Sequence, residues 1–540
     1  MAVLRHIGST LLRWLSRIWR WRWRIFGTAC LVLLIAVGHA FYAYYGIDEA
    51  EAWFGQDDAA SNDPVRQFKY GSTGGDRLIG IPVGIFNALP ELCRDYLPGD
   101  GWTSLGFIVE PGMSRPVGTS LRHSLGFDRI SLNCAACHVG TYRATPADAP
   151  VVVAGMPAHR LDLTRFARFL SQCALDERFN PWQVVQAAER TGAGYSWLDR
   201  LLLRYVAVPA MKEFLVLAQH RFRFLNMQTE PGPGRFDTFG PAKALLNWHF
   251  EALPRREMVG VNDFPSLWLQ DPREDMRLHW DGNNDSVEER NRSAAFGTGA
   301  VPATLDRASL DAIAGWLRSP GNQPPAYPFP IDRDLAEIGK QHYQRLCADC
   351  HGRDGRDFTG GRVGHPEPIA HIRTDPCRLD NYTVELAREQ GNLYAAFPAE
   401  RFTHFRKTDG YANMPLDGLW LRGPYLHNGS VPTVRDLLEP WSQRPAAFYR
   451  GYDVIDQERL GFVSDVASAD GVEHFRYETR CLAGPVLCAQ YENPDNRHDD
   501  NRCVPGPWAG NSNRGHDGPA YGTDLPAADK DAVVEYLKTF

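Results

Sequence analysis

The chain lacks an excess of basic residues. Its 540 residues include 58 Lys and Arg against 65 Asp and Glu, which gives a net charge of −7, and charges of both signs are interspersed. A protein that binds nucleic acid needs clustered cations to neutralise the phosphates. The sequence therefore gives no support to a nucleic-acid-binding function.

Long hydrophobic runs are also absent, apart from one near the N-terminus. Residues 25–45 carry no charge, and as a helix these 21 residues would span about 31 Å, close to the hydrocarbon thickness of a bilayer. The preceding residues 1–24 are rich in Arg and Trp, which favours a cytoplasmic N-terminus. The sequence predicts that residues 1–46 form a cytoplasmic N-terminus with an inner-membrane anchor and that the remaining chain is periplasmic.

A cleaved signal peptide is the alternative interpretation of this run. Signal peptides usually carry an apolar core of about 7–15 residues and small residues at the cleavage site. The run here is longer, and its end contains His39, Phe41 and Tyr42. An uncleaved anchor is therefore favoured.

Cysteine is scarce, at 11 of 540 residues, yet four cysteines fall in two copies of one motif. By chance, a chain of this composition would hold about 0.007 copies of the pattern C-x-x-C-H. The pattern is the attachment signature of c-type haem, in which two thiols form thioethers with the porphyrin and the histidine becomes an iron ligand. The two copies consist of Cys134, Cys137 and His138 and of Cys347, Cys350 and His351.

The alternative is one zinc site built from both cysteine pairs, or free thiols. Zinc ligand pairs usually lie much closer in sequence than the 213 residues that separate Cys134 from Cys347. We therefore predict two covalently attached haem c groups, each with one iron.

The other cysteines bear on the compartment. Haem attachment places the chain on an oxidising side of a membrane, where disulfides form. Besides Cys30 in the apolar run, six cysteines remain, and they are Cys93, Cys173, Cys377, Cys481, Cys488 and Cys503. A bond from Cys481 to Cys488 or Cys503 is the favoured pairing, and buried free thiols are the alternative.

Glycine and proline, at 49 and 38 residues, exceed average usage and predict long ordered loops. Apolar side chains at helical spacing predict helices at residues 161–175 and 310–317. Five prolines between residues 320 and 330 indicate a stiff linker. We therefore predict a first haem domain at residues 47–325 and a second at residues 326–540.

Two helices define the predicted second domain. One begins at Asp332 and carries Gly339 towards the second motif, and the last covers residues 526–540. This pair resembles the cytochrome c fold, in which the two helices cross and a small residue lets them approach. The predicted fold class is mainly α, with two cytochrome c-like haem domains, long irregular loops and one N-terminal transmembrane helix.

Three further stretches resemble the dihaem rubber oxygenases and the bacterial dihaem cytochrome c peroxidases. The first is similar to a Phe-Trp-Asp-Gly-Arg stretch, the second to Pro-Tyr-x-His-x-Gly-Ser, and the third precedes the final helix. They are Leu278-His279-Trp280-Asp281-Gly282-Asn283, Gly423-Pro424-Tyr425-Leu426-His427-Asn428-Gly429-Ser430-Val431 and Arg514-Gly515-His516. The resemblance covers nearly all of residues 60–540.

The resemblance implies roles at the two haems. Trp280 matches the tryptophan that lies between them, where an indole can relay an electron. His138 would be the proximal ligand of the first haem and His351 that of the second. The alternative for Trp280 is an ordinary buried side chain.

The resemblance also implies a sixth ligand for the second haem. His516 matches the position that supplies it in rubber oxygenases, and a haem held by two histidines is closed to substrates and suited to electron storage. Met414 is the second candidate and His427 the third.

The first haem would be the reactive one. Phe296 matches the position of an apolar residue on its open face, with a core phenylalanine as the alternative. His249 or His279 could instead close this haem. The peroxidases carry a catalytic Glu about twenty residues beyond the tryptophan, but residues 298–301 contain no acid, and Glu288 and Glu289 lie too near Trp280.

The predicted function is that of a membrane-anchored periplasmic oxidoreductase that activates O2 or H2O2 at the first haem. The second haem would be its electron-transfer centre, supplied by a small redox protein. Oxygenase-like and peroxidase-like chemistry remain open, and so does a non-catalytic dihaem electron carrier.

Overall fold

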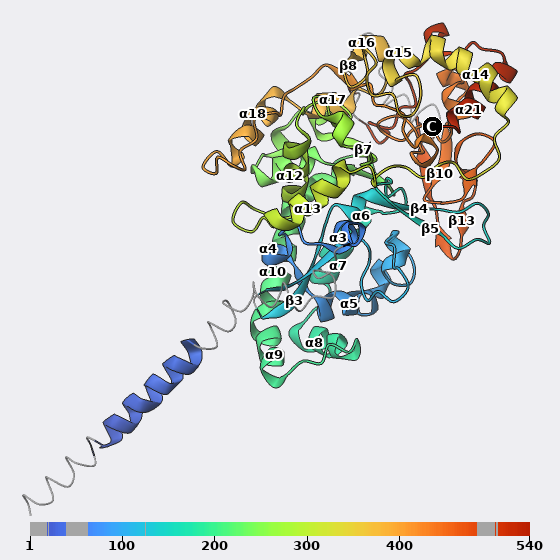
Figure 1. The fold of residues 1–540 in the computed structure, drawn as a ribbon. Helices are drawn as coiled ribbons and strands as arrows, with labels where there is room; N and C mark the ends of the chain where they lie inside the picture. Colours follow the sequence, from blue (N-terminus) through green and yellow to red (C-terminus); the bar gives the residue numbers. More distant parts are fainter. Residues whose placement is uncertain (1–18, 20, 39–62, 125, 483–502, 504–505) are drawn as a thin grey trace, which may run out of the picture.

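The structure, a computed structural model, describes residues 19, 21–38, 63–124, 126–482, 503 and 506–540 (Figure 1). Helix Trp21–Gly38 is long and apolar enough to cross a bilayer, and none of it is buried in the protein. The anchor or signal segment expected from the sequence is therefore present as a helix. Much of the basic N-terminus and residues 39–45 of the apolar run lie outside the described residues.

The first half of the chain combines short helices with small hairpins. Its helices are α3 (Pro64–Tyr70), α4 (Asp76–Ile79), α5 (Val83–Leu92), α6 (Ala135–His138), α7 (Leu163–Leu175), α8 (Pro181–Arg190), α9 (Trp197–Leu202), α10 (Val208–Arg221), α11 (Phe239–Leu245), α12 (Val287–Gly297) and α13 (Arg307–Arg318). Its strands are β1 (Ile81–Pro82), β2 (Thr119–Ser124), β3 (Phe127–Leu132), β4 (Val139–Tyr142), β5 (Val151–Ala154), β6 (Arg235–Asp237) and β7 (Val261–Asp263).

The second half has the same mixed character. Its helices are α14 (Arg333–Leu346), α15 (Ala348–His351), α16 (Ile369–Ile372), α17 (Cys377–Asn381), α18 (Val384–Leu393), α19 (Val434–Leu437) and α21 (Ala527–Leu537). Its strands are β8 (Pro366–Pro368), β9 (Gly410–Ala412), β10 (Ala447–Arg450), β11 (Ile455–Asp456), β12 (Gly461–Phe462), β13 (Ser468–Ala469), β14 (Val472–Glu473) and β15 (Phe475–Glu478).

The predicted fold class, a mainly α chain of two cytochrome c-like domains, is wrong. Helices make up 43% of the protein, but 12% is strand, and the described strands pair into seven small sheets, one of three strands and six of two. The sheet β1-β3-β2 shows the cause. Its six-residue strands β2 (Thr-Ser-Leu-Arg-His-Ser) and β3 (Phe-Asp-Arg-Ile-Ser-Leu) do not alternate strictly between polar and apolar side chains, so they lack the pattern that marks a half-buried strand in a sequence.

The predicted helix crossing in the second half is confirmed. α14 packs on α21, and a Cβ added to Gly339 would lie 1.8 Å from the carbonyl oxygen of Ala532. Only glycine permits this approach of the two backbones. The predicted helices at 161–175 and 310–317 are also present, as α7 and α13.

Two large hydrophobic cores organise the described chain. One packs α5, α7, α8 and the 3₁₀ turn Trp102–Leu105 around Phe169 and Val184. The other joins residues from both halves, because Met156 and Trp268 pack with Trp420. The predicted boundary near residue 325 stays a prediction, and this shared core crosses it.

Two disulfides are described. Cys93 bonds Cys173 and Cys377 bonds Cys503. The predicted Cys481–Cys503 pairing is therefore wrong, because Cys503 is already bonded. Cys481 is also disulfide-bonded, while Cys488, its other predicted partner, lies outside the described residues. Spacing in sequence did not reveal these pairs because segments 80 and 126 residues apart meet in the fold.

Candidate functional site

The two motifs lie on the short helices α6 and α15, and their four cysteines are unbridged. Burial raises the pKa of the Cys134 thiol to about 11 and that of Cys137 and Cys347 to about 12. Burial thus favours the protonated form of these thiols. The four motif cysteines form no disulfide, whereas the other described cysteines, apart from Cys30, do. Thioether attachment of a haem requires two cysteine thiols that form no disulfide and lie beside a histidine.

The histidines of the two motifs are held in the same way. His138 Nδ1 lies 2.8 Å from the Pro265 carbonyl oxygen, and His351 Nδ1 lies 2.7 Å from that of Met414. A carbonyl can only accept, so Nδ1 carries the proton and donates in both rings. Nε2 is then unprotonated, which is the tautomer that binds iron.

Burial keeps both rings neutral. It lowers the pKa of His138 to about 4 and lowers the pKa of His351. Neutral imidazoles with a fixed tautomer are ready to act as axial ligands.

Asn133 fixes the first motif to the preceding chain. Its side-chain amide donates to the carbonyl oxygen of Gly71 at 2.9 Å, and its oxygen accepts from the amide of Ala135 at 2.9 Å. Gly118 (φ 85°) lies so close to α6 that an added Cβ would approach the Ala136 backbone to 2.3 Å. Helix α6 therefore packs directly against the backbone of Gly118, which precedes β2.

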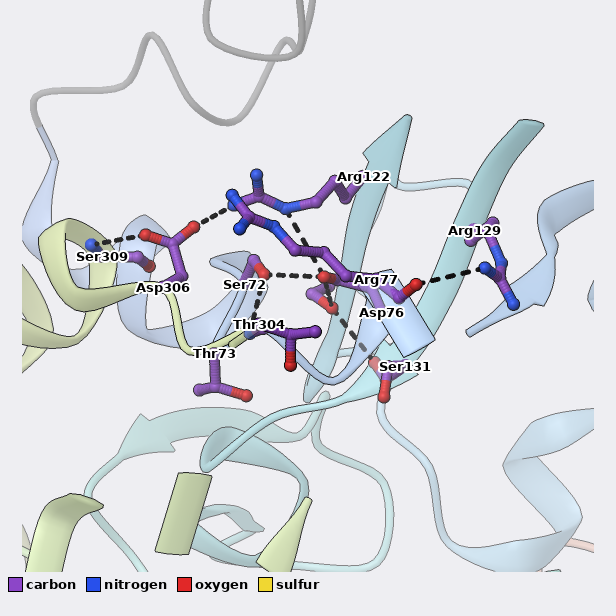
Figure 2. Close-up of polar contacts among 12 residues, drawn as sticks. Ser72, Thr73, Asp76, Arg77, Arg122, Arg129, Ser131, Thr304, Asp306 and Ser309 are labelled. Atoms are coloured by element: carbon purple, nitrogen blue, oxygen red, sulfur yellow. Dashed lines mark hydrogen bonds and ion pairs between the residues drawn. The ribbon is translucent and has the colours of Figure 1, made fainter. Parts of the chain in front are cut away.

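A buried ionic network supports the segment that Asn133 contacts (Figure 2). Asp76 is fully buried and accepts from Ser72 at 2.9 Å and from Ser120 at 2.5 Å, and its carboxylate faces Arg122 at 3.4 Å. Arg122 also bonds Asp306 at the start of α13. The network ties α4, β2 and α13 together.

His516 lies opposite His351. The two ring centres are 6.2 Å apart and the ring planes differ by 21°. Metal–imidazole bonds are about 2.0–2.1 Å long, so two imidazoles on opposite sides of one metal have centres about 6 Å apart. The spacing of these rings therefore fits one iron between them.

The loop that carries His516 is built around one arginine. Arg444 is buried and donates to the carbonyl oxygens of Asn513, Gly515 and His516 at 2.5, 2.8 and 3.0 Å. Burial, with a smaller contribution from His351, lowers the pKa of His516 to about 3. Its Nδ1 is buried and has no hydrogen-bond partner among the described residues. The protein thus holds a neutral imidazole at this place and leaves its Nδ1 without a hydrogen bond from the described residues.

The other proposed sixth ligands are placed differently. Met414 lies on the His351 side, since its carbonyl accepts from the His351 ring. His427 is buried and stacks on Tyr411 with ring centres 4.1 Å apart. His249 is exposed. Of these candidates, only His516 faces a motif histidine ring at a distance that fits a shared iron.

Trp280 shares a cavity with Pro265 and Arg422. Its indole Nε1 donates to the Asp263 carbonyl oxygen at 2.8 Å, and it lines a small cavity of about 10 Å³. Pro265, which accepts from His138, lines one part of this cavity, and Arg422 lines another. Arg422 donates to the Pro415 carbonyl oxygen at 2.7 Å, beside the Met414 carbonyl that holds His351.

His159 in the same cavity is a residue that sequence reasoning missed. It is 4% exposed, and neither ring nitrogen has a hydrogen-bond partner in the described part of the chain. Its ring stacks on Phe462 at 4.1 Å. No motif marks His159, because its burial follows from the Phe462 segment, which comes about three hundred residues later.

Phe296 is not brought to the first motif by the contacts described. Its ring packs on Tyr394 and Phe402, with centres 4.6 and 5.8 Å away. Arg290, two turns earlier on α12, lies close enough to His138 and His279 to lower the pKa of both. The role predicted for Phe296 stays a prediction, and on the same helix the charge of Arg290 acts on His138.

The neighbouring acids are already engaged. Glu289 is buried and accepts from the Asn284 side chain at 3.0 Å and from the Thr403 amide at 2.7 Å. Glu288 is exposed and pairs with Arg292. Neither is free to act as a peroxidase-type acid.

Within the described ranges, no group of three or more His, Cys, Asp or Glu side chains could hold a metal ion. A protein-only zinc site at either motif is therefore not formed there. A haem brings four nitrogen ligands of its own, so one or two histidines suffice.

Comparisons with known proteins agree with a haem cytochrome. Residues 410–449 match the family described as RoxA-like, cytochrome c-like. This stretch includes Met414 and most of the loop with Arg422 and His427, and the match implies covalently bound haem c.

Two relatives come from Sinorhizobium fredii. The chain is 30% identical to the protein named uncharacterized protein y4iM over 315 residues, which cover 52% of this chain and 64% of the relative. It is 25% identical to uncharacterized protein y4iJ over 553 residues, covering 83% of this chain and 85% of that protein. The chain thus spans less than two thirds of the first relative's length.

Proposed function

We propose that the chain is a periplasmic c-type cytochrome with two haem groups, anchored to the inner membrane by residues 1–46. O2 or H2O2 would react at the site of His138, and electrons would be held at the site of His351. The observation that carries this proposal is the different environment of two histidines that are fixed alike. His351 faces His516 at 6.2 Å, and no described aromatic ring pairs with His138.

A bound haem c would supply an iron that exchanges single electrons and, where an axial position is open, accepts small oxygen ligands. His351 and His516 would together hold the iron of the second haem, which would leave no place there for substrate. His138 would occupy one position of the first site. The proposed roles, reaction at the first site and electron storage at the second, follow from this difference in the number of histidines.

Trp280 is proposed as the electron relay. It lines a cavity that also touches Pro265, behind His138, and Arg422, beside the carbonyl that holds His351. The indole N–H is bonded to a backbone carbonyl, which keeps the ring in one orientation. An ordinary packing role would leave electron transfer between the sites unchanged when Trp280 is replaced by Phe.

The reaction class is proposed as oxidation with O2, by resemblance to rubber oxygenases, or reduction of H2O2 with electrons from a small redox protein. O2 uptake with an isoprenoid substrate tests the first, and H2O2 consumption with reduced cytochrome c tests the second. A non-catalytic electron carrier is the second candidate function. It would follow if His279 closed the first site, and the charge of Arg290 acts on both His279 and His138.

Low-temperature EPR of the oxidised full chain tests the proposal. We expect one high-spin and one low-spin ferric signal, with the low-spin signal lost in His516→Ala. His427→Ala is the matched control, because it removes another buried histidine that faces no motif ring, and it should keep both signals.

Two results would overturn the proposal. Two low-spin signals in the unmodified protein would mean that the first site is closed, and would favour the electron carrier. An unchanged low-spin signal in His516→Ala would remove His516 from the second site.

A further inference from the structure

The helical segment after α7 exposes an unusual amount of apolar surface. In the described chain beyond Gly38, twenty large hydrophobic side chains are exposed, and eleven of them lie within residues 182–227. The six that define what we call the apolar face are Trp182, Trp197, Tyr205, Val206, Phe214 and Leu217. Soluble proteins rarely leave such a concentration uncovered, so the face indicates an interaction.

The apolar face lies mainly on one long helical segment. α9, the π-turn Leu203–Ala207 and α10 follow one another without a break from residue 197 to residue 221, about 37 Å of helix. Only Leu203, Val208 and Leu215 are buried in it. A helix that is apolar on its outer side as well as its inner side is normally covered on both.

α8 extends the same surface. Trp182 is 59% exposed, and the guanidinium of Arg204 lies 4.3 Å from the centre of its ring. Figure 1 shows α8, α9 and α10 together at one end of the molecule, opposite α14, α15 and α16. The apolar face is therefore separate from the second motif.

The charge of this segment identifies its occupant. Residues 182–227 contain six Arg and Lys and three Asp and Glu, a net charge of +3 in a chain whose total is −7. Exposed Trp and Tyr favour the interface between lipid and water, and cations among apolar side chains favour anionic lipid.

We propose that the apolar face lies in the interfacial layer of an anionic lipid bilayer. The segment between the apolar helix and α3, residues 39–62, could span up to about 80 Å when extended. That length lets helix Trp21–Gly38 and the apolar face contact the same bilayer. The proposal goes beyond the proposed function and does not depend on which haem is open.

Photo-crosslinking in a bilayer tests the proposal. The full chain is placed in nanodiscs of phosphatidylethanolamine and phosphatidylglycerol with a photoreactive benzoylphenylalanine at Leu201, which is 42% exposed. We expect crosslinks to lipid. Burial of each large apolar side chain favours the bound state by about tenfold or more, so the triple variant Trp197→Ser, Tyr205→Ser and Leu217→Ser should lower the lipid crosslink yield by at least about tenfold.

The matched control replaces two exposed apolar residues elsewhere. Val384→Ser with Phe397→Ser changes side chains that are 61% and 46% exposed on or beside α18 and should leave the yield unchanged. The visible haem spectrum and circular dichroism verify that each variant is folded.

Three outcomes would overturn the proposal. Crosslinks to a second copy would make the apolar face a dimer interface, and crosslinks to residues 39–62 would mean that the chain covers itself. Equal lipid yields from the unmodified chain and the triple variant would mean that the face does not touch lipid.

Discussion

The two C-x-x-C-H motifs are alike in sequence and in the bond that fixes their histidines, yet their surroundings differ. Each histidine donates to a backbone carbonyl from a later segment. His351 then faces the ring of His516, whereas the positive charge of Arg290 acts on His138. The motif thus determines where a haem attaches, while distant segments determine what it can do.

The largest expected effect is the loss of one haem. Cys347→Ala with Cys350→Ala removes both thioether positions of the second motif, so the purified chain should carry one haem instead of two. Intact mass and the pyridine haemochrome assay measure the number. The EPR spectrum should then lack the low-spin signal.

The same change at Cys134 and Cys137 should instead remove the high-spin signal. Cys30→Ala, at a free thiol outside both motifs, is the control. An identical spectrum from both double variants would break the distinction between the two sites.

The next effect concerns the support of the first motif. Asp76→Asn leaves Arg122 in a buried network without its full counter-charge (Figure 2). Breaking a buried ion pair typically costs about 3–5 kcal/mol, which denaturant unfolding would measure.

Asp100→Asn is the control for this change. Asp100 pairs with Arg94, but the side chains are 83% and 68% exposed, so the loss should be less than about 1 kcal/mol. Equal effects of the two variants would show that the network does not support the first motif.

The third effect is a dependence of stability on pH. Burial, with help from Arg378 and Arg235, holds the pKa of His427 well below 6.5. Below pH 6.5 the unfolded chain takes up a proton at His427 and the folded chain does not. The free energy of unfolding is therefore unaffected by His427 above pH 6.5 and decreases as the pH falls below it. Because the folded-state pKa of His427 is well below 6.5, the loss grows by up to about 1.4 kcal/mol for each pH unit below 6.5.

His427→Phe keeps the ring that stacks on Tyr411 and removes the titration. Denaturant unfolding below pH 6.5 should show a shallower acid slope for the variant. A slope equal to that of the unmodified chain would mean that His427 is charged or solvated in the folded protein.

The smallest expected effect separates two candidates at the first site. Because Phe296 packs on Tyr394 and Phe402, Phe296→Leu should change the cyanide affinity of the ferric protein by less than about twofold. Arg290→Gln removes a buried cation near His138 and should change it by about tenfold, or 1.4 kcal/mol. The opposite ranking would restore Phe296 to the open face predicted from the sequence.

Local patterns predicted much of this site, and long-range contacts account for the rest. The motif spacing indicated six attachment residues, helical periodicity predicted α7 and α13, and the resemblance to the cytochrome c fold predicted the Gly339 crossing. The strands were missed because they are only two to six residues long, too short for periodicity to separate them from loops. His159, Arg290 and the Pro265 carbonyl carry no motif, since their relevance follows from segments that meet only in the folded chain.

The bonds that fix the two motif histidines also bear on the order of assembly. The carbonyl of Pro265 comes 127 residues after His138, and that of Met414 comes 63 residues after His351. A chain that emerges from a membrane N-terminus first exposes each pair of thiols well before the acceptor that orients its histidine. Covalent attachment can thus precede ligand orientation at both sites, and the proposed pair of His351 and His516 forms only when the C-terminal segment arrives.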